Sequence, residues 1–293
     1  MKTNDEIKAL FSLLDDPDEL VFSSVSERIL SFGKSIIPSL EDYWENANDE
    51  IIQNKIEDLI QKVNLNEVKD KLSVWEEKEN ASLIDSIILL SKYMYPNLDE
   101  NEIHKTIKSI HSSCWLELNE YLTPLEEIHI INSIFYNMYK LSAERNAIKN
   151  PTAYYINEVL QRRSGNQYSL AMLYQLIAKM LDIPIFAMKV SNFVVLGYFD
   201  TIFDFSDLTK LPEHKTQFFI EPTEGTILSQ QDVAAFIKKY EIDVTEESFK
   251  PIKNRDFLYY YLQSLRRAYE TEQNEDKAAD IQRLMDHIFP DWV

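Results

Sequence analysis

The chain has 293 residues, enough for one large domain or for two to three small ones. Apolar residues make up 45% and charged residues 27%, as in soluble globular proteins, and only 4 glycines argue for helices over a turn-rich sheet fold. The formal net charge of -19 repels phosphate backbones and anionic headgroups, so we expect neither nucleic acid nor a membrane surface as a partner. Unless the charge serves solubility alone, it would attract a basic protein or a cationic peptide.

The single cysteine, Cys114, excludes an intrachain disulfide, and nothing in the sequence indicates an oxidising compartment. The N-terminal segment is charged and amphipathic and has no apolar core of the signal-peptide type. No apolar run approaches the roughly 18 to 20 residues of a membrane-spanning helix. We therefore expect a cytoplasmic protein, and no motif implies a cofactor or a metal.

Residues 1–75 read as consecutive short helices. Asp16-Pro17-Asp18 supplies a cap and a first turn, apolar residues then recur at helical spacing, and Gly33 stops the helix. Further apolar stripes begin at Ile36 and Ile51. Helices of this kind bury their apolar faces only against neighbours, so the sequence predicts a HEAT-like helical region.

Within residues 76–250 the sequence pattern changes from helical to strand-like. Helical patterns cover 80–145, and a further helix over 153–163 breaks at Gly165 before a strongly apolar helix over 168–181. Short β-branched or aromatic runs follow at 185–190, 193–199 and 217–221, which is typical of strands. Helices packed against a small antiparallel sheet make an α+β domain.

Residues 251–293 are helical again. Two apolar stripes are separated by a polar segment from Glu270 to Asp276, which predicts a helical hairpin similar to a tetratricopeptide unit. The predicted fold is therefore α+β and mostly helical: a helical N-terminal region, a core with a small antiparallel sheet, and a C-terminal helical hairpin.

The middle of the chain resembles a known family. The segment NPTAYYINEVLQRRSGNQYSLAMLYQLIAKMLDIPIFAM, followed by SNFVVLGYFD and FFIEPTEGTILSQQDV, is similar to bacterial transglutaminase-like proteins of the SirB type. The helical N-terminal region and the tetratricopeptide-like hairpin fit the same family, although residues 150–230 carry the specific likeness. The resemblance implies a papain- or transglutaminase-like core.

The resemblance also implies where a catalytic triad would lie. Transglutaminase-like enzymes attack an acyl carbon with a cysteine at the start of the central helix, paired with a histidine on one strand and an aspartate on the next. Here the cysteine position in GNQYS is Gln167, the histidine position in SNF is Asn192, and the aspartate position in IEP is Glu221. Because triad members act as a unit, the resemblance predicts no thiol catalysis and no catalytic residues.

Several other residues could carry chemistry. Ser169 could replace the cysteine, but it should point about 200° away around the helix axis, as a packed helix serine would. His111, Cys114 and His129 could hold a metal, although a lone buried cysteine beside surface histidines explains them more simply. Arg162 and Arg163 could bind an anion, or complement the helix dipole.

The tyrosine run Tyr259, Tyr260 and Tyr261 covers most of a helix circumference, so it could form a peptide-binding surface or pack between domains. The positions of Gln167 and Asn192 could face a cleft with Glu221, and such a cleft would be a recognition site or a remnant.

The function that follows is a non-catalytic transglutaminase-like protein that binds or scaffolds a protein or peptide in the cytoplasm. The alternative is a hydrolase or transferase with a rebuilt, non-thiol site around Glu221, helped by His214 from the preceding loop.

Overall fold

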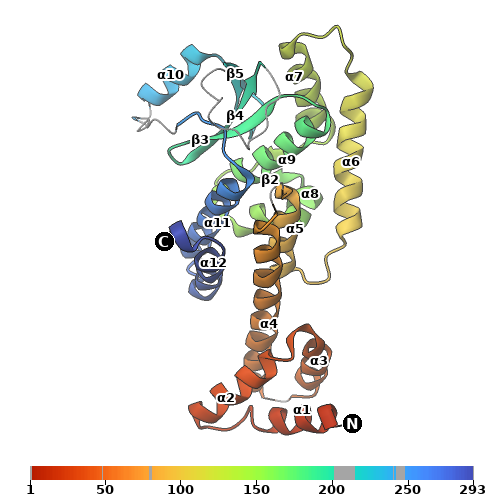
Figure 1. The fold of residues 1–293 in the computed structure, drawn as a ribbon, viewed down its shortest axis with the longest axis vertical. Helices are drawn as coiled ribbons and strands as arrows, with labels where there is room; N and C mark the ends of the chain where they lie inside the picture. Colours follow the sequence, from red (N-terminus) through yellow and green to blue (C-terminus); the bar gives the residue numbers. More distant parts are fainter. Residues whose placement is uncertain are drawn as a thin grey trace.

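The computed structural model describes residues 2–47, 49–78, 81–200, 215–239, 241 and 248–292. Helices dominate, and one four-stranded antiparallel sheet lies near the upper end of the molecule in Figure 1. The predicted fold class, mostly helical α+β with a small antiparallel sheet and a C-terminal helix pair, is confirmed. No helix in these described ranges has the length and apolar content needed to cross a bilayer.

The N-terminal helices form a separate small hydrophobic cluster at the lower end of the molecule (Figure 1). They are α1 Lys2–Ser12, α2 Glu19–Leu30, the 3-10 turn η1 Gly33–Ile36, α3 Ile37–Asn46 and α4 Glu50–Glu76. Asp18 caps α2 by accepting the N–H of Leu20 at 2.9 Å, as its position in the sequence predicts. Gly33 takes a positive φ of 59°, so the chain can turn sharply after α2.

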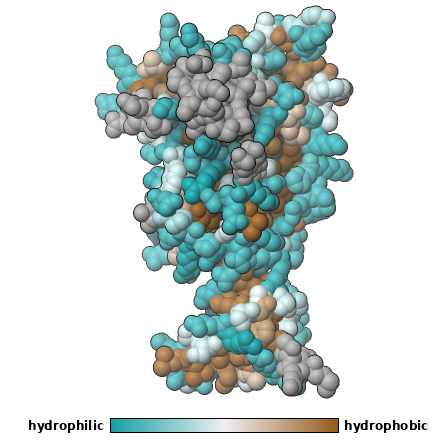
Figure 2. Space-filling model, viewed as in Figure 1, coloured by the Kyte–Doolittle hydropathy of each residue, from teal (hydrophilic) through white to brown (hydrophobic). Residues whose placement is uncertain are grey.

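The 27-residue helix α4 connects this cluster to the main core. Its first half packs into the small cluster as far as Val63, and its second half packs into the main core from Leu65 onward. The domain boundary expected at residue 75 lies next to the end of α4 at Glu76, whereas the change of hydrophobic core lies inside the helix. Figure 2 shows a narrow waist here, with hydrophobic surface over α2 below it, where Leu20 is exposed.

The middle of the chain wraps helices around α9. These elements are α5 Leu83–Met94, α6 Glu100–Glu117, α7 Pro124–Asn132, the π-helical turn η2 Ser133–Met138, β1 Ser142–Ala143, η3 Ala147–Lys149, η4 Pro151–Tyr154, α8 Ile156–Arg162, β2 Ser164–Gly165 and α9 Gln167–Met180. β1 pairs with β2 in parallel directly before α9, which lies buried in the main core. The predicted break at Gly165 therefore separates α8 from α9.

The sheet has the order β3–β4–β5–β6, with all pairs antiparallel. Its strands are β3 Ile185–Val190, β4 Phe193–Phe199, β5 Thr216–Ile220 and β6 Ile227–Leu228. The first two have the predicted bounds, and the third lies one residue earlier than predicted. One face contributes Ala187 and Leu196 to the main core beside α9. The other face packs Met188 against Val233 of α10 Gln230–Lys239.

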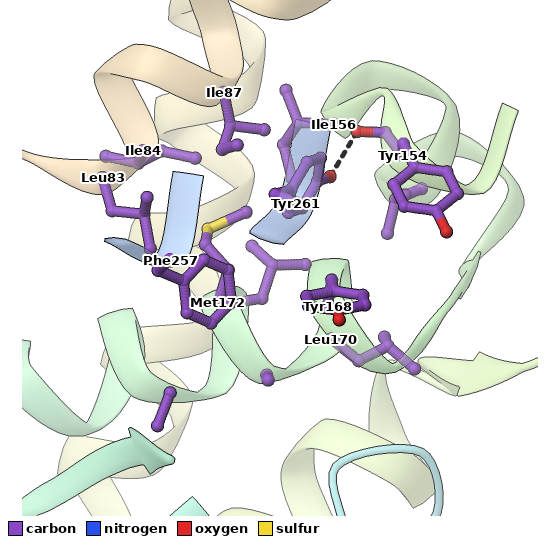
Figure 3. Close-up of a cluster of buried hydrophobic side chains, with 14 of the residues drawn as sticks. Leu83, Ile84, Ile87, Tyr154, Ile156, Tyr168, Leu170, Met172, Phe257 and Tyr261 are labelled. Atoms are coloured by element: carbon purple, nitrogen blue, oxygen red, sulfur yellow. Dashed lines mark hydrogen bonds between the residues drawn. The ribbon is translucent and has the colours of Figure 1, made fainter. Parts of the chain in front are cut away.

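The C-terminal helices α11 Asn254–Thr271 and α12 Glu275–Ile288 form the predicted hairpin and end in the 3-10 turn η6 Pro290–Trp292. α11 inserts Phe257 and Tyr261 among side chains of α5 and α9 (Figure 3). α12 lies against α4, where buried Asp280 accepts hydrogen bonds from Tyr93 and Gln61, each at 2.6 Å. The hairpin thus shares the main core with the sheet-bearing part of the chain.

Candidate functional site

The first turn of α9 is held rigidly by its own cap. The side-chain oxygen of buried Asn166 accepts the N–H groups of Tyr168 at 2.8 Å and Ser169 at 3.1 Å. The Ser169 hydroxyl in turn accepts the Asn166 N–H at 2.9 Å, which completes a capping box. A Cβ on Gly165 would lie 2.5 Å from this hydroxyl, so a larger residue there would have to displace the Ser169 side chain. Ser169 is fully buried, in line with its predicted packed role.

Gln167, at the cysteine position, begins α9 and joins it to the β3–β4 hairpin. Its amide Nε2 donates to the carbonyl oxygen of Asn192 at 2.9 Å, and its Oε1 accepts the N–H of Val194 at 3.3 Å. The helix N-terminus and the hairpin turn therefore approach each other, as the resemblance implies for cysteine and histidine. The atoms in contact are a carboxamide and the backbone, and neither can act as a nucleophile.

Asn192, at the histidine position, lies in the two-residue turn between Val190, the last residue of β3, and Phe193, the first residue of β4, which pair with each other. Ser191 takes a positive φ of 54° in this turn. The side chain of Asn192 is exposed. A carboxamide cannot exchange a proton near neutral pH, so this position supplies no general base.

Glu221, at the aspartate position, follows β5 and caps its own turn. Its Oε2 accepts the N–H of Thr223 at 3.0 Å, the Thr223 hydroxyl at 2.6 Å and the N–H of Glu224 at 3.0 Å. Within the described residues this carboxylate makes no hydrogen bond to Gln167 or Asn192. The structure thus brings Gln167 and the backbone of Asn192 together, whereas the carboxylate of Glu221 is bound by groups of its own turn.

Tyr136 of η2 holds the Glu221 turn in place. Its hydroxyl donates to the carbonyl oxygen of Pro222 at 2.9 Å. Burial, and secondarily the charge of Glu221, raise the pKa of this phenol far above its usual value. Gly225 of the same turn has a φ of 74°, and a Cβ there would collide with the Tyr136 ring at 2.3 Å. The turn is therefore built around the Tyr136 ring. The hydroxyl of Tyr136 stays protonated at neutral pH.

The only thiol lies elsewhere. Cys114 is fully buried on α6, and burial raises its pKa to about 12, so it stays protonated at neutral pH. His111 of the same helix contacts the carbonyl oxygen of Met180 at 3.2 Å. Among the described residues no group of three or more His, Cys, Asp or Glu side chains is arranged to hold a metal ion. Arg162 forms an ion pair with Glu158 of the same helix at 2.7 Å.

The tyrosine run divides between core and surface. Tyr261 is fully buried, and its hydroxyl donates to the carbonyl oxygen of Tyr154 (Figure 3), so it packs between segments and offers no binding surface. Tyr259 is half-buried, with its ring centroid 4.5 Å from that of Trp292. Tyr260 is half-buried beneath the ammonium of Lys189, at 4.2 Å. Only Tyr259 and Tyr260 keep accessible ring surface for a partner.

Lys189 beside the hairpin was missed by the sequence reasoning. β3 places it opposite Val194, the residue whose N–H is bound by Gln167. The sequence does carry a signal: in the segment IFAMKV, alternation along the strand places Lys189 on the same face as the core residues Ile185 and Ala187. A cation at an inward strand position indicates a local function or a specific partner.

A central helix whose N-terminus faces the hairpin of a small antiparallel sheet is the framework on which the transglutaminase-like class carries its triad. The model of the transglutaminase-like superfamily matches residues 101–263, more than half of the chain, and the chain belongs to this superfamily. The N-terminal cluster and α12 lie outside the matched segment.

Relatives are distant. The chain is 25% identical to protein SirB1 of Salmonella typhimurium over 109 residues, which cover 37% of this chain and 40% of SirB1. It is 23% identical over 211 residues to a UPF0162 protein of Xylella fastidiosa strain 9a5c, covering 69% of this chain and 70% of that protein. The match spans only 40% of the length of the first of these relatives. No solved structure matches the chain.

Proposed function

We propose that this chain is a non-catalytic member of the superfamily and that it binds or scaffolds a protein or peptide partner. The observation that carries the proposal is the bridge made by Gln167. Where a thiol would have to meet an imidazole, a carboxamide joins the backbone of Asn192 and Val194 by two hydrogen bonds. This contact stabilises the arrangement of helix and hairpin but offers no group that can attack a carbonyl carbon.

The surroundings of the bridge support a binding role. The cation Lys189 lies opposite Val194 in the hairpin and over the half-buried ring of Tyr260, which contacts the half-buried ring of Tyr259. Aromatic side chains with one accessible face supply much of the contact energy in protein interfaces. The acidic surface would add attraction for basic segments of a partner.

The alternative, a hydrolase or transferase centred on Glu221, has less support. The Oε2 atom of Glu221 already accepts three hydrogen bonds from its own turn, which leaves this oxygen poorly placed to take a proton from water. His214, which the alternative would recruit, lies outside the described residues.

The test is an acyl-transfer and hydrolysis assay. Purified protein is incubated with a glutamine-rich acceptor protein plus a fluorescent primary amine, and separately with activated ester substrates. We expect no turnover above the buffer background, and no difference between the natural chain and a Glu221→Gln variant. Turnover that disappears in Glu221→Gln would refute the non-catalytic function and support the hydrolase. Turnover that persists in that variant but is lost after alkylation of Cys114 would instead restore thiol chemistry.

A further inference from the structure

The corner between α6 and α7 exposes four large apolar or aromatic side chains within one short stretch of the chain. They are Trp115 and Leu116 in the last turn of α6, Tyr121 in the connection and Leu125 in the first turn of α7, exposed by 65%, 74%, 85% and 47% respectively. We call these four residues the corner face. Single exposed apolar residues are ordinary, but a group of them marks an interaction surface.

The corner face is exposed because both helices extend beyond the core at this end. Cys114 is the last buried residue of α6, Ile128 is the first buried residue of α7, and no residue from 115 to 127 is buried. In Figure 1 the connection lies at the upper end of the molecule, and Figure 2 shows hydrophobic surface there. The four side chains are therefore largely open to solvent.

The corner is held in shape by its own hydrogen bonds. The Thr123 hydroxyl accepts the N–H of Glu126 at 3.4 Å, and the Glu126 carboxylate accepts the N–H and the hydroxyl of Thr123, each at 2.8 Å, which completes a capping box. Within the connection, the side chain of Asn119 accepts the N–H of Tyr121 at 3.1 Å. A face that is already ordered loses little conformational entropy when it binds a partner.

The charges that accompany the corner face are all negative. The same stretch carries Glu117, Glu120, Glu126 and Glu127, and the sequence has no Lys or Arg from 109 to 139. Hydrogen bonds from the N–H and the hydroxyl of Thr123 lower the pKa of Glu126, so this carboxylate stays charged at neutral pH. Among the described residues none of these four glutamates forms an ion pair. Apolar contact surface and uncompensated negative charge thus occur together.

This charge decides between three occupants of the face. A second copy of the chain would place the same glutamates opposite these, and the net charge of -19 on each copy would add to the repulsion. An anionic lipid surface would be repelled for the same reason. Lysine and arginine side chains of another protein would be attracted, and apolar side chains between them would cover the exposed rings and leucines.

We propose that the corner face binds a basic amphipathic segment of another protein. Its apolar side chains would pack on Trp115, Leu116 and Leu125, and its lysine or arginine side chains would lie beside Glu117 and Glu120. The inference rests on the proposed binding function, because it names the chemistry of the partner and the surface that would receive it. Aromatic and apolar contacts would supply the affinity, while the glutamates would orient the segment and speed its association.

The experiment is fluorescence anisotropy of a labelled helical peptide made of leucine and lysine, about 18 residues long, with leucine on one face. The full chain is titrated into this peptide at neutral pH and about 50 mM salt, where charge attraction is only partly screened. We expect saturable binding that weakens several-fold at about 500 mM salt. No saturable binding up to about 200 µM chain, or binding that ignores salt, would overturn the proposal.

A leucine variant locates the apolar contact. Leu116→Ser removes a side chain that the peptide would cover, and it should weaken binding by about tenfold or more. Leu20→Ser is the matched control, because Leu20 on α2 is 79% exposed at the opposite end of the molecule, and this variant should bind as the natural chain does. Equal effects of the two substitutions would overturn the location. Circular dichroism verifies that both variants are folded.

A charge variant locates the electrostatic contact. Glu117→Gln combined with Glu120→Gln should weaken peptide binding by about fivefold and reduce its dependence on salt, because exposed charges contribute modestly. The same two changes at Glu41 and Glu45, both exposed on α3, alter the net charge equally and serve as the control. An equal loss in the α3 variant would mean that the peptide senses only the net charge, which would overturn the assignment.

The other two occupants are tested directly. Sedimentation velocity of the chain alone reports self-association, and flotation with vesicles that contain phosphatidylserine reports lipid binding. We expect a species of the same size for the natural chain and Leu116→Ser, and no flotation of either. A dimer or a vesicle-bound form that is lost in Leu116→Ser would assign the face to that occupant and overturn the basic partner.

The outcomes also separate this inference from the function it rests on. Peptide binding that is lost in Leu116→Ser, found together with catalytic turnover, would refute the non-catalytic function and keep the corner face. No peptide binding and no turnover would refute the corner face and leave the binding function to the half-buried rings of Tyr259 and Tyr260.

Discussion

The bridge made by Gln167 leads to a quantitative prediction about local stability. Gln167→Ala removes the hydrogen bond to the carbonyl oxygen of Asn192 at 2.9 Å and the one from the Val194 N–H at 3.3 Å. A net hydrogen bond contributes about 0.5–1.5 kcal/mol, but the second is long, and water can reach a half-buried side chain and replace part of the loss. The combined cost should be about 1 kcal/mol. This cost should lower the free energy needed to open the β3–β4 hairpin away from α9.

Amide hydrogen exchange measures this directly, because it reports local opening without requiring the whole chain to unfold in one step. About 1 kcal/mol corresponds to roughly fivefold faster exchange in the hairpin, with the Val194 amide affected most. Gln161→Ala, the same change at an exposed position of α8, is the control and should leave the hairpin unchanged. Equal exchange in the two variants would refute the view that the Gln167 amide holds helix and hairpin together.

Three further changes probe the buried groups. Buried Cys114 should react with a disulfide reagent at pH 8 only after denaturation. Because the pKa of its thiol rises from 9.0 to about 12 on folding, the free energy of unfolding should fall as the pH rises from about 9 towards 12. Asp280→Ala leaves the Tyr93 hydroxyl without its acceptor and should destabilise the chain by about 2 kcal/mol in urea unfolding. Gly165→Ala would push a methyl group against the Ser169 hydroxyl, breaking the cap of α9 at a cost of about 1 kcal/mol in thermal unfolding.

Each of these has an outcome that contradicts it. Rapid labelling of native Cys114 would mean that α6 opens readily. An unchanged urea midpoint for Asp280→Ala would mean that water already satisfies Tyr93. A Gly165→Ala melting temperature equal to that of the natural chain would mean that the Ser169 side chain can rotate away without loss. Asp286→Ala, the same change at an exposed position on α12, serves as the control for Asp280→Ala.

Local patterns in the sequence were enough for most of the fold. Strands 185–190 and 193–199 were predicted with the bounds that the structure has, because alternating β-branched and aromatic residues define a half-buried strand. The cap at Asp18 and the break at Gly165 were also readable, since both depend on a few neighbouring residues. The sequence does not reveal that α4 runs through two hydrophobic cores, because a change of packing partner does not alter the helical periodicity.

The site divides in the same way. The loss of cysteine and histidine at Gln167 and Asn192 follows from residue identity once the family resemblance is recognised. That the Gln167 amide binds the hairpin backbone depends on side-chain geometry. The occupation of Glu221 by its own turn could have been suspected from the Thr223 that follows, since short polar residues close such turns.

The sequence by itself determined the helical character, the acidic charge, the class of the protein and the absence of a thiol–imidazole pair at the triad positions, because these depend on residue identity and short-range periodicity. Only the tertiary structure decided that Tyr261 is core while Tyr260 lies under Lys189. These residues come from two elements, β3 and α11, that lie far apart in the chain. Their proximity follows from how α11 packs against α9 and the sheet, and a local sequence pattern cannot encode that long-range packing.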